Sequence, residues 1–233
     1  MKPLSFDIVA FDLDGTLADT APDLAAALNH ALERLGRPGV PPEDVRHLVG
    51  HGARALLRKG LAESGEASEA LVEQGFPHFI DFYAANICNG TAAYPDAEEA
   101  MNDLRRHGAA LALCTNKPER LTHLLLEALG WQERFDSVVG GDTFAVRKPD
   151  PLPLREAIAR AGGGRAAFVG DSIVDSETAR AAGLPFVAVS FGFSDRPAEE
   201  LGADAVIDTF ADLNAAIDRL AGGAPITPER TFS

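Results

Sequence analysis

Two aspartates, Asp12 and Asp14, follow directly after an apolar run and are the side chains best placed for chemistry. They stand in the string FDLDGTLADT, where Gly15 lets the backbone turn. An Asp-Gly pair by itself predicts no more than a turn. The whole string, placed where a buried strand ends, instead favours a functional site.

Three later segments place polar side chains where an apolar run gives way to a loop. These side chains are Thr115, Asn116, Lys148, Asp171 and Asp175. In a parallel sheet the carboxyl ends of the strands lie on one edge, where such proteins bind their ligands. We therefore expect these side chains to meet Asp12 and Asp14 in one crevice.

Four carboxylates in one crevice repel one another, and without compensation some of them would be protonated at neutral pH. A hard divalent cation with oxygen ligands removes the conflict. Mg²⁺ fits best, because it uses few carboxylates, keeps water ligands and shares a phosphate oxygen. Lys148 would add a second positive charge that keeps Asp12 ionised and faces a phosphoryl oxygen. A solvated surface lysine is the ordinary alternative for Lys148, but its place in line with the other loops favours function.

The rest of the chain predicts the elements that must position this crevice. Short apolar runs occur at 6–11, 110–114, 136–141, 166–170, 186–191 and 204–208, and segments with helical spacing occur at 118–130, 153–162 and 174–183. Strands that alternate with helices of this length are typical of a parallel sheet covered on both faces. We predict a doubly wound, Rossmann-like α/β core.

One long stretch interrupts this alternation. The residues between 20 and 90 show helical patterns and no convincing strand. We predict an α/β core domain from 1–19 and 91–221, a helical cap domain from 20–90, and a flexible tail at 222–233. The cap would follow the first strand, at the end of the sheet where the crevice is expected.

The composition excludes several classes of function. The formal charge is −14, from 35 acidic and 21 basic residues, which argues against sequence-independent binding to nucleic acid or to an anionic membrane. Cys88 and Cys114 form no zinc pattern. The N-terminal sequence lacks the features of a signal peptide, and no apolar run approaches the length of a membrane span. We expect a cytoplasmic monomer or homodimer, and the carboxylates with Lys148 favour a small-molecule phosphate ester as its substrate.

Four strings, in order, resemble the motifs of the haloacid dehalogenase superfamily: FDLDGTLADT, CTNK, RKPDP and GDSIVD. The resemblance covers nearly the whole chain, including a cap inserted after the first motif. It implies a Mg²⁺-dependent phosphatase that forms an aspartyl-phosphate on Asp12, with Asp14 as general acid and base. It also implies that Thr115 and Asn116 bind the phosphoryl group and that Lys148 neutralises charge.

For the metal, the resemblance implies ligation by Asp171, by Asp12 and by the backbone carbonyl of Asp14, with Asp175 in support. Dehalogenases of the superfamily lack the second aspartate of the first motif, so Asp14 argues against that reaction. Hexose phosphomutases carry a lysine and an arginine around the cap glycine, where this chain has Val49 and Ala53. A binding or regulatory protein on the same scaffold remains as a non-enzymatic alternative.

Within the superfamily, the nearest resemblance is to phosphoglycolate phosphatases. It rests on 11–32, on VGHGARALLRKGL at 49–61 and on Tyr94-Pro95. Phosphatases of pyrophosphate, sugar phosphates and amino-sugar acid phosphates share similar stretches and remain alternatives. His51 and Arg54 lie beside a glycine turn of the cap, where they could contact a substrate carboxylate. A structural or surface role is the ordinary alternative for both.

Overall fold

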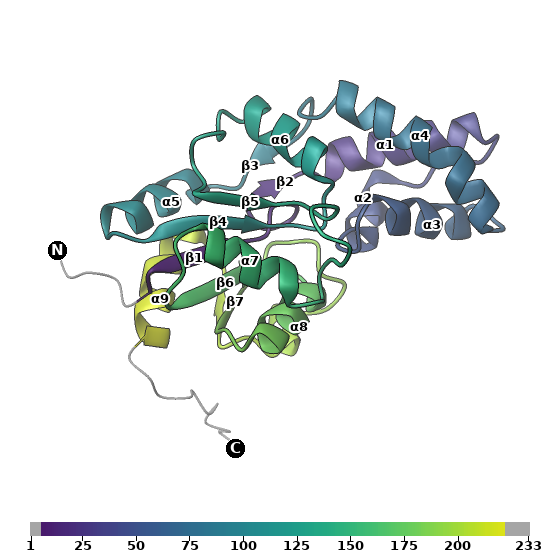
Figure 1. Ribbon diagram of the computed structural model, residues 1–233. Helices are drawn as coiled ribbons and strands as arrows, with labels where there is room; N and C mark the ends of the chain where they lie inside the picture. The colour runs from purple at the N-terminus through teal and green to yellow at the C-terminus, as the bar shows by residue number, and fades with distance from the viewer. Residues whose placement is uncertain (1–5, 222–233) are drawn as a thin grey trace, which may run out of the picture.

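The computed structural model describes residues 6–221, and its centre is a six-stranded parallel sheet (Figure 1). The strands are β1 (Ile8–Phe11), β4 (Ala110–Cys114), β5 (Ser137–Val139), β6 (Ala166–Gly170), β7 (Phe186–Val189) and β8 (Ala205–Ile207). Their order across the sheet is β5-β4-β1-β6-β7-β8, and every pairing is parallel. The predicted doubly wound α/β core is confirmed.

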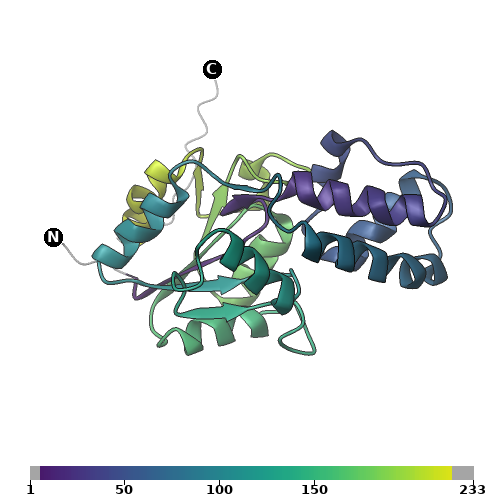
Figure 2. The same cartoon turned by 90° about the horizontal axis from the view of Figure 1, so that it is seen from above.

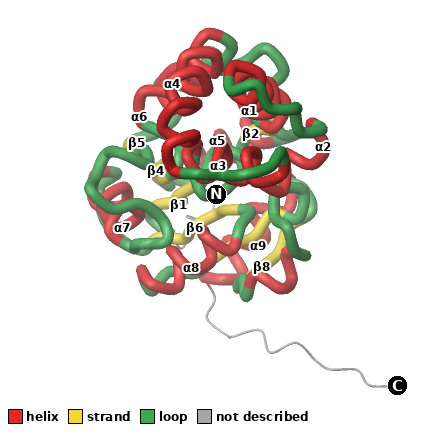
Figure 3. Tube along the Cα trace, turned by 90° about the vertical axis from the view of Figure 1, so that its right-hand side faces the viewer, coloured by secondary structure: helices red, strands yellow, loops and turns green. Residues whose placement is uncertain are grey.

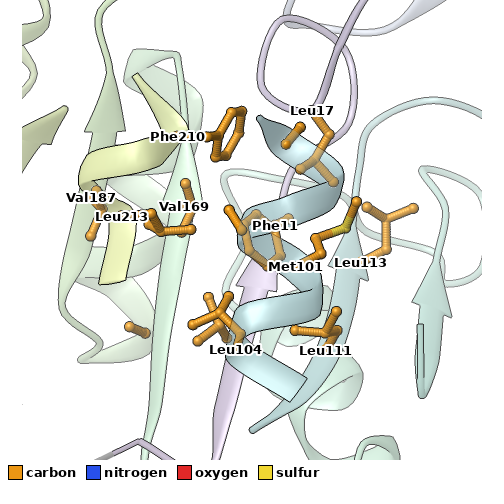
Figure 4. Packing of buried hydrophobic residues seen from close by; sticks show 14 of the residues in the cluster. Phe11, Leu17, Met101, Leu104, Leu111, Leu113, Val169, Val187, Phe210 and Leu213 are labelled. Carbon is orange, nitrogen blue, oxygen red and sulfur yellow. The ribbon is translucent and has the colours of Figure 1, made fainter. Parts of the chain in front are cut away.

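Both faces of this sheet are buried, as the apolar runs require. Along β1, Val9 and Phe11 face one hydrophobic cluster while Ile8 and Ala10 face the other. Figure 4 shows Phe11 on the first face, packed with Met101 and other side chains of the neighbouring helices. The alternation follows from the two-residue period of a strand.

Helices flank the sheet on these two faces. They are α5 (Ala97–Arg106), α6 (Glu119–Ala128), α7 (Leu152–Arg160), α8 (Ile173–Ala182) and α9 (Leu213–Ala221), with short 3-10 turns η2 (Ala198–Leu201) and η3 (Phe210–Asp212). A third 3-10 turn, η1 (Arg46–Leu48), belongs to the segment between β1 and α5. Residues of α5 and α9 join the cluster on one face, and residues of α7 and α8 join the cluster on the other. None of the described helices is long and apolar enough to cross a lipid bilayer.

The helices between the first strand and α5 form a group of their own. They are α1 (Ala21–Arg34), α2 (Pro42–Val45), α3 (Ala53–Glu63) and α4 (Glu69–Ala85). Leu28, Leu57, Val72 and Phe79 belong to a third hydrophobic cluster, which these helices share. Figures 2 and 3 show the group at one end of the sheet. This arrangement supports the cap at 20–90 and the core at 1–19 and 91–221 that we propose; the tail at 222–233 lies outside the described residues.

The chain crosses between the two groups twice, and the crossings lie side by side. The antiparallel strands β2 (Ala18–Asp19) and β3 (Ala92–Ala93) pair there. The buried carboxylate of Asp23, in the first turn of α1, accepts hydrogen bonds from the amides of Gly90 (2.9 Å) and Thr91 (2.8 Å) and from the Thr91 hydroxyl (2.7 Å). These bonds fasten the start of α1 to the returning chain and so orient the cap over the sheet edge.

Candidate active site

The carboxyl edge of the sheet gathers the side chains that the sequence singled out. Asp12 directly follows β1, Thr115 follows β4, and Asp171 follows β6. The strands are in register at this point, because Phe11 pairs with both Leu113 and Val169. The polar side chains that come next therefore lie on one edge and are buried.

Lys148 lies between two of the carboxylates. Its Nζ is 3.0 Å from Oδ1 of Asp12 and 2.7 Å from Oδ1 of Asp175, and its side chain is buried. Burial opposes the charge of Lys148, but Asp12 and Asp175 outweigh it and raise the pKa above its ordinary value. Lys148 is therefore a permanent ammonium at the floor of the site.

The carboxylates themselves are crowded. One oxygen each of Asp12, Asp171 and Asp175 lies within 4.8 Å of the others. The pKa of Asp12 is raised from 3.8 to about 6, chiefly because the side chain is buried. Lys148 lowers this pKa, and the neighbouring carboxylates raise it further. Burial, Asp175 and Asp12 raise the pKa of Asp171 well above its ordinary value. The protein thus holds more negative charge here than Lys148 offsets.

The charge of this cluster marks where a cation fits. Oδ1 of Asp12 is buried and accepts no hydrogen bond, and the ammonium of Lys148 that lies 3.0 Å from it is shared with Asp175. Buried carboxylate charge is costly unless cations balance it, and one lysine faces three carboxylates here. Hard carboxylate oxygens are the ligands that Mg²⁺ prefers, so the residues present fit this ion.

Asp171 is held rigidly for such a role. It accepts a hydrogen bond from the Thr16 hydroxyl (3.2 Å) and another from the backbone amide of Phe193 (2.7 Å). Gly15, with a φ of 80°, and Gly192 pack so closely that an added Cβ would overlap the Asp171 carboxylate. The turn after Asp14 therefore needs a glycine for its backbone angle and for this contact.

Asp175 has both oxygens engaged by protein groups. Oδ2 accepts from the amide (3.1 Å) and the hydroxyl (2.6 Å) of Ser172 in a capping box at the start of α8, and Oδ1 accepts from Lys148. These contacts favour a supporting role, in which Asp175 orients Lys148 and contributes charge.

Thr115 and Asn116 join the loops to one another. The Thr115 hydroxyl accepts from the amide of Lys117 (3.2 Å), and the Asn116 amide nitrogen donates to the carbonyls of Lys148 (3.1 Å) and Gly50 (3.4 Å). Oδ1 of Asn116 is buried without a hydrogen-bond partner. Both side chains line the same pocket as Asp12 and Asp14.

Lys117 is a site residue that the sequence reasoning missed. Its buried Nζ donates to Oδ1 (2.8 Å) and Oδ2 (3.1 Å) of Asp14 and to the hydroxyl of Tyr83 on α4 (2.7 Å). Burial opposes its charge, but Asp14 and Tyr83 raise its pKa above the ordinary value. The signal was present in CTNK, where a lysine follows Asn116 at a strand end. Nothing local in the sequence points to Tyr83.

The two cap residues predicted to contact substrate are placed differently. The Arg54 guanidinium forms an ion pair with Glu73 and lies 4.1 Å above the centre of the Phe76 ring, so the structure does not bring Arg54 to the pocket of Asp12. His51 is exposed and lines a second hollow beside Asp171. Burial, then the nearby Lys59 and Arg147, lower the pKa of His51.

The pocket of Asp12 lies between the sheet edge and the cap. Its floor consists of the polar residues Asp12, Asp14, Thr115, Asn116 and Lys117. Its walls are mainly apolar and come largely from the cap: Leu24, Val49, Gly50, Gly52, Ala53, Leu56, Phe79, Tyr83, Pro118 and Leu121. A nucleophile at the floor of a small covered pocket suits a small substrate that reacts away from bulk water.

Known proteins resemble this chain in sequence and in fold. Residues 9–189 match the family model described as haloacid dehalogenase-like hydrolase. The chain is 45% identical to a phosphoglycolate phosphatase of Caulobacter vibrioides over 93% of each chain, and 43% identical to one of Agrobacterium fabrum over 93% of this chain and 94% of that one. A solved structure described as a predicted phosphoglycolate phosphatase from Haemophilus somnus 129PT superposes with a TM-score of 0.84, at 31% identity over 90% of this chain and 96% of that one.

Proposed function

The chain belongs to the haloacid dehalogenase-like hydrolase family, and we propose that it hydrolyses 2-phosphoglycolate to glycolate and phosphate. It is a phosphoric monoester hydrolase. The observation that carries the chemistry is the buried group of Asp12, Asp171 and Asp175 around Lys148, with an Asp12 oxygen left without a hydrogen bond. The proposed substrate rests on the phosphoglycolate phosphatases of Caulobacter vibrioides and Agrobacterium fabrum, which this chain matches over nearly their full length.

We propose Mg²⁺ as the cofactor. Asp12, Asp171 and the backbone carbonyl of Asp14 would hold it, with Asp175 in support. When bound, Mg²⁺ would offset the negative charge of the carboxylates and polarise a phosphoryl oxygen. The crowding of the three carboxylates supports this assignment, because burial and the neighbouring carboxylates raise the pKa values of Asp12 and Asp171, and a bound cation would offset both effects.

In the first step, the Asp12 carboxylate attacks phosphorus in line with the leaving oxygen. The bond from phosphorus to that oxygen breaks, and Asp14 donates a proton to the departing alkoxide. Lys148 and the Thr115 hydroxyl, with Asn116, would bind the equatorial phosphoryl oxygens and stabilise the charge that develops there.

In the second step, Asp14 takes a proton from a water molecule that attacks phosphorus of the aspartyl-phosphate. The acyl phosphate bond breaks, phosphate leaves, and the Asp12 carboxylate is regenerated. Two displacements of lower barrier replace one difficult displacement by water. Nζ of Lys117 lies 2.8 Å from Oδ1 of Asp14 and holds this carboxylate at the floor of the pocket.

Two alternatives are less well supported. A hexose phosphomutase would need the lysine and the arginine around the cap glycine, and Val49 and Ala53 line the pocket at those places. A regulatory protein on this scaffold would have no need to retain the nucleophile, the lysine and the metal aspartates together. The cytoplasmic location and the monomeric or homodimeric state remain predictions from the sequence.

The test is a comparison of kcat/KM over small phosphate esters in the presence of Mg²⁺. We expect 2-phosphoglycolate to exceed glycerol phosphate, hexose phosphates and pyrophosphate, because the pocket is small and its walls are mainly apolar. If a hexose phosphate or pyrophosphate has the higher kcat/KM, the proposed substrate is wrong while the phosphatase chemistry stands.

A further inference from the structure

Lys117 is the only positively charged side chain among the described residues that line the pocket above Asp12. Asp14 must contact the leaving oxygen when it acts as the general acid, so the leaving group has to lie next to Asp14. Nζ of Lys117 touches both oxygens of Asp14. The part of the substrate beyond the phosphoryl group therefore lies within reach of Lys117.

Tyr83 adds a second donor at the same place. Its hydroxyl accepts a hydrogen bond from Lys117, so its own proton needs a different acceptor, and the hydrogen bonds of residues 6–221 include none for it. Burial raises the pKa of Tyr83, so the hydroxyl keeps its proton. The side chain is 1% exposed and lines the pocket. A buried O–H without an acceptor is costly unless a ligand provides one.

From these contacts we propose that Lys117 and Tyr83 bind the carboxylate of the leaving group and so select a short phospho-acid. The inference rests on the proposed phosphatase function and assigns its substrate specificity to two residues. An ammonium and a phenol proton suit a carboxylate, which is an acceptor only. The walls formed by Leu24, Leu56 and Phe79 would leave the hydroxyls of a sugar without partners.

Three basic residues of the cap helix α3 are engaged elsewhere. Arg54 pairs with Glu73, Arg58 pairs with Glu69, and Lys59 donates to the carbonyl of Leu48. None of these three cations lines the pocket that contains Asp12 and Asp14. The carboxylate receptor therefore comes from the loop after β4 and from one cap helix, α4, which meet at Nζ of Lys117.

The experiment compares kcat/KM for 2-phosphoglycolate with kcat/KM for 2-hydroxyethyl phosphate, in which a neutral CH₂OH replaces the carboxylate. We expect Tyr83→Phe to lower the ratio of the two values about tenfold and Lys117→Met to lower it about a hundredfold. Lys117→Met also slows both substrates, because Asp14 loses its partner, and the ratio separates the two effects. Arg54→Met is the matched control and should leave the ratio unchanged.

The outcomes separate this inference from the proposed function. If the wild-type enzyme hydrolyses neither ester, the proposed function is wrong. If it prefers 2-phosphoglycolate and both variants keep that preference, the substrate stands and the roles of Lys117 and Tyr83 are refuted. If Arg54→Met strongly lowers the ratio of the two kcat/KM values, the roles of Lys117 and Tyr83 are also refuted, because a cation of the cap then selects the substrate. Tyr83→Phe keeps the buried ring, so it decides the question even if Lys117→Met does not fold.

Discussion

Replacing Asp12 by asparagine should abolish turnover and, in the metal-free protein, raise stability. Asparagine keeps the shape of the side chain but carries no charge, so it cannot attack phosphorus as a carboxylate does. It also removes one of the crowded carboxylates, whose charge Lys148 and two backbone amides offset only in part. Loss of activity and gain of stability in one variant would separate catalysis from folding.

The size of the gain follows from the pKa of Asp12, which is raised from 3.8 to about 6. At about 1.4 kcal/mol per pKa unit, the charged form costs the folded state about 3 kcal/mol. Because the folded pKa is the higher one, the folded protein binds the proton more tightly than the unfolded chain does. Stability is therefore lost as pH rises from about 4 through about 6. The Asp12→Asn variant does not lose stability in this way, because asparagine does not ionise.

The assay is thermal unfolding of both proteins in chelator, from pH 4 to pH 7.5. We expect nearly equal melting temperatures at the acidic end and an advantage for Asp12→Asn of roughly 5–10 °C at pH 7.5. Added Mg²⁺ should raise the wild-type melting temperature more than that of the variant, because Asp12 is a proposed ligand. A difference in melting temperature that did not change with pH would refute the reasoning from the buried charge of Asp12.

Three other changes test the site. In steady-state assays in metal buffers, chelation should abolish activity and Mg²⁺ should restore it. Ca²⁺ should inhibit the enzyme, because the larger ion takes more ligands and would bind both oxygens of Asp12. Lys148→Met leaves two buried carboxylates unpaired and should lower turnover by orders of magnitude and the unfolding free energy by about 3 kcal/mol. Arg120→Met, at an exposed position on α6, is the surface control for the denaturant titration. Gly192→Ala places a Cβ 2.6 Å from Oδ2 of Asp171, so we expect weaker Mg²⁺ activation in a titration, with the fold retained by circular dichroism.

The sheet and the catalytic edge were predictable because both depend on local patterns. Each of the six strands falls within an apolar run of the sequence, and the run at 110–114 coincides with β4. Parallel topology then brings the ends of separate strands to one edge, as observed for Asp12, Thr115 and Asp171. Strand ends differed by one or two residues in places, as at β1, which begins at Ile8 where the run begins at 6.

The contacts of the cap were not predictable in this way. Arg54 and Glu73 lie on different helices and are 19 residues apart, so helical spacing cannot reveal their pairing. Tyr83 reaches Lys117 because α4 packs beside α1 over the sheet edge, and that packing depends on the whole apolar cluster. The sequence pointed to a need for positive charge near the leaving group, but the fold decides which cation is available.

The most direct test of the central claim is to trap the covalent intermediate. The enzyme would be mixed with substrate and Mg²⁺, quenched in acid within milliseconds and treated with borohydride, which reduces an aspartyl-phosphate to homoserine. Mass spectrometry of the peptides should then find homoserine at position 12, with Asp14 unchanged and no conversion in Asp12→Asn. Conversion at Asp14, or full turnover with no protein-bound phosphate at any time, would contradict the assignment of Asp12 as the nucleophile.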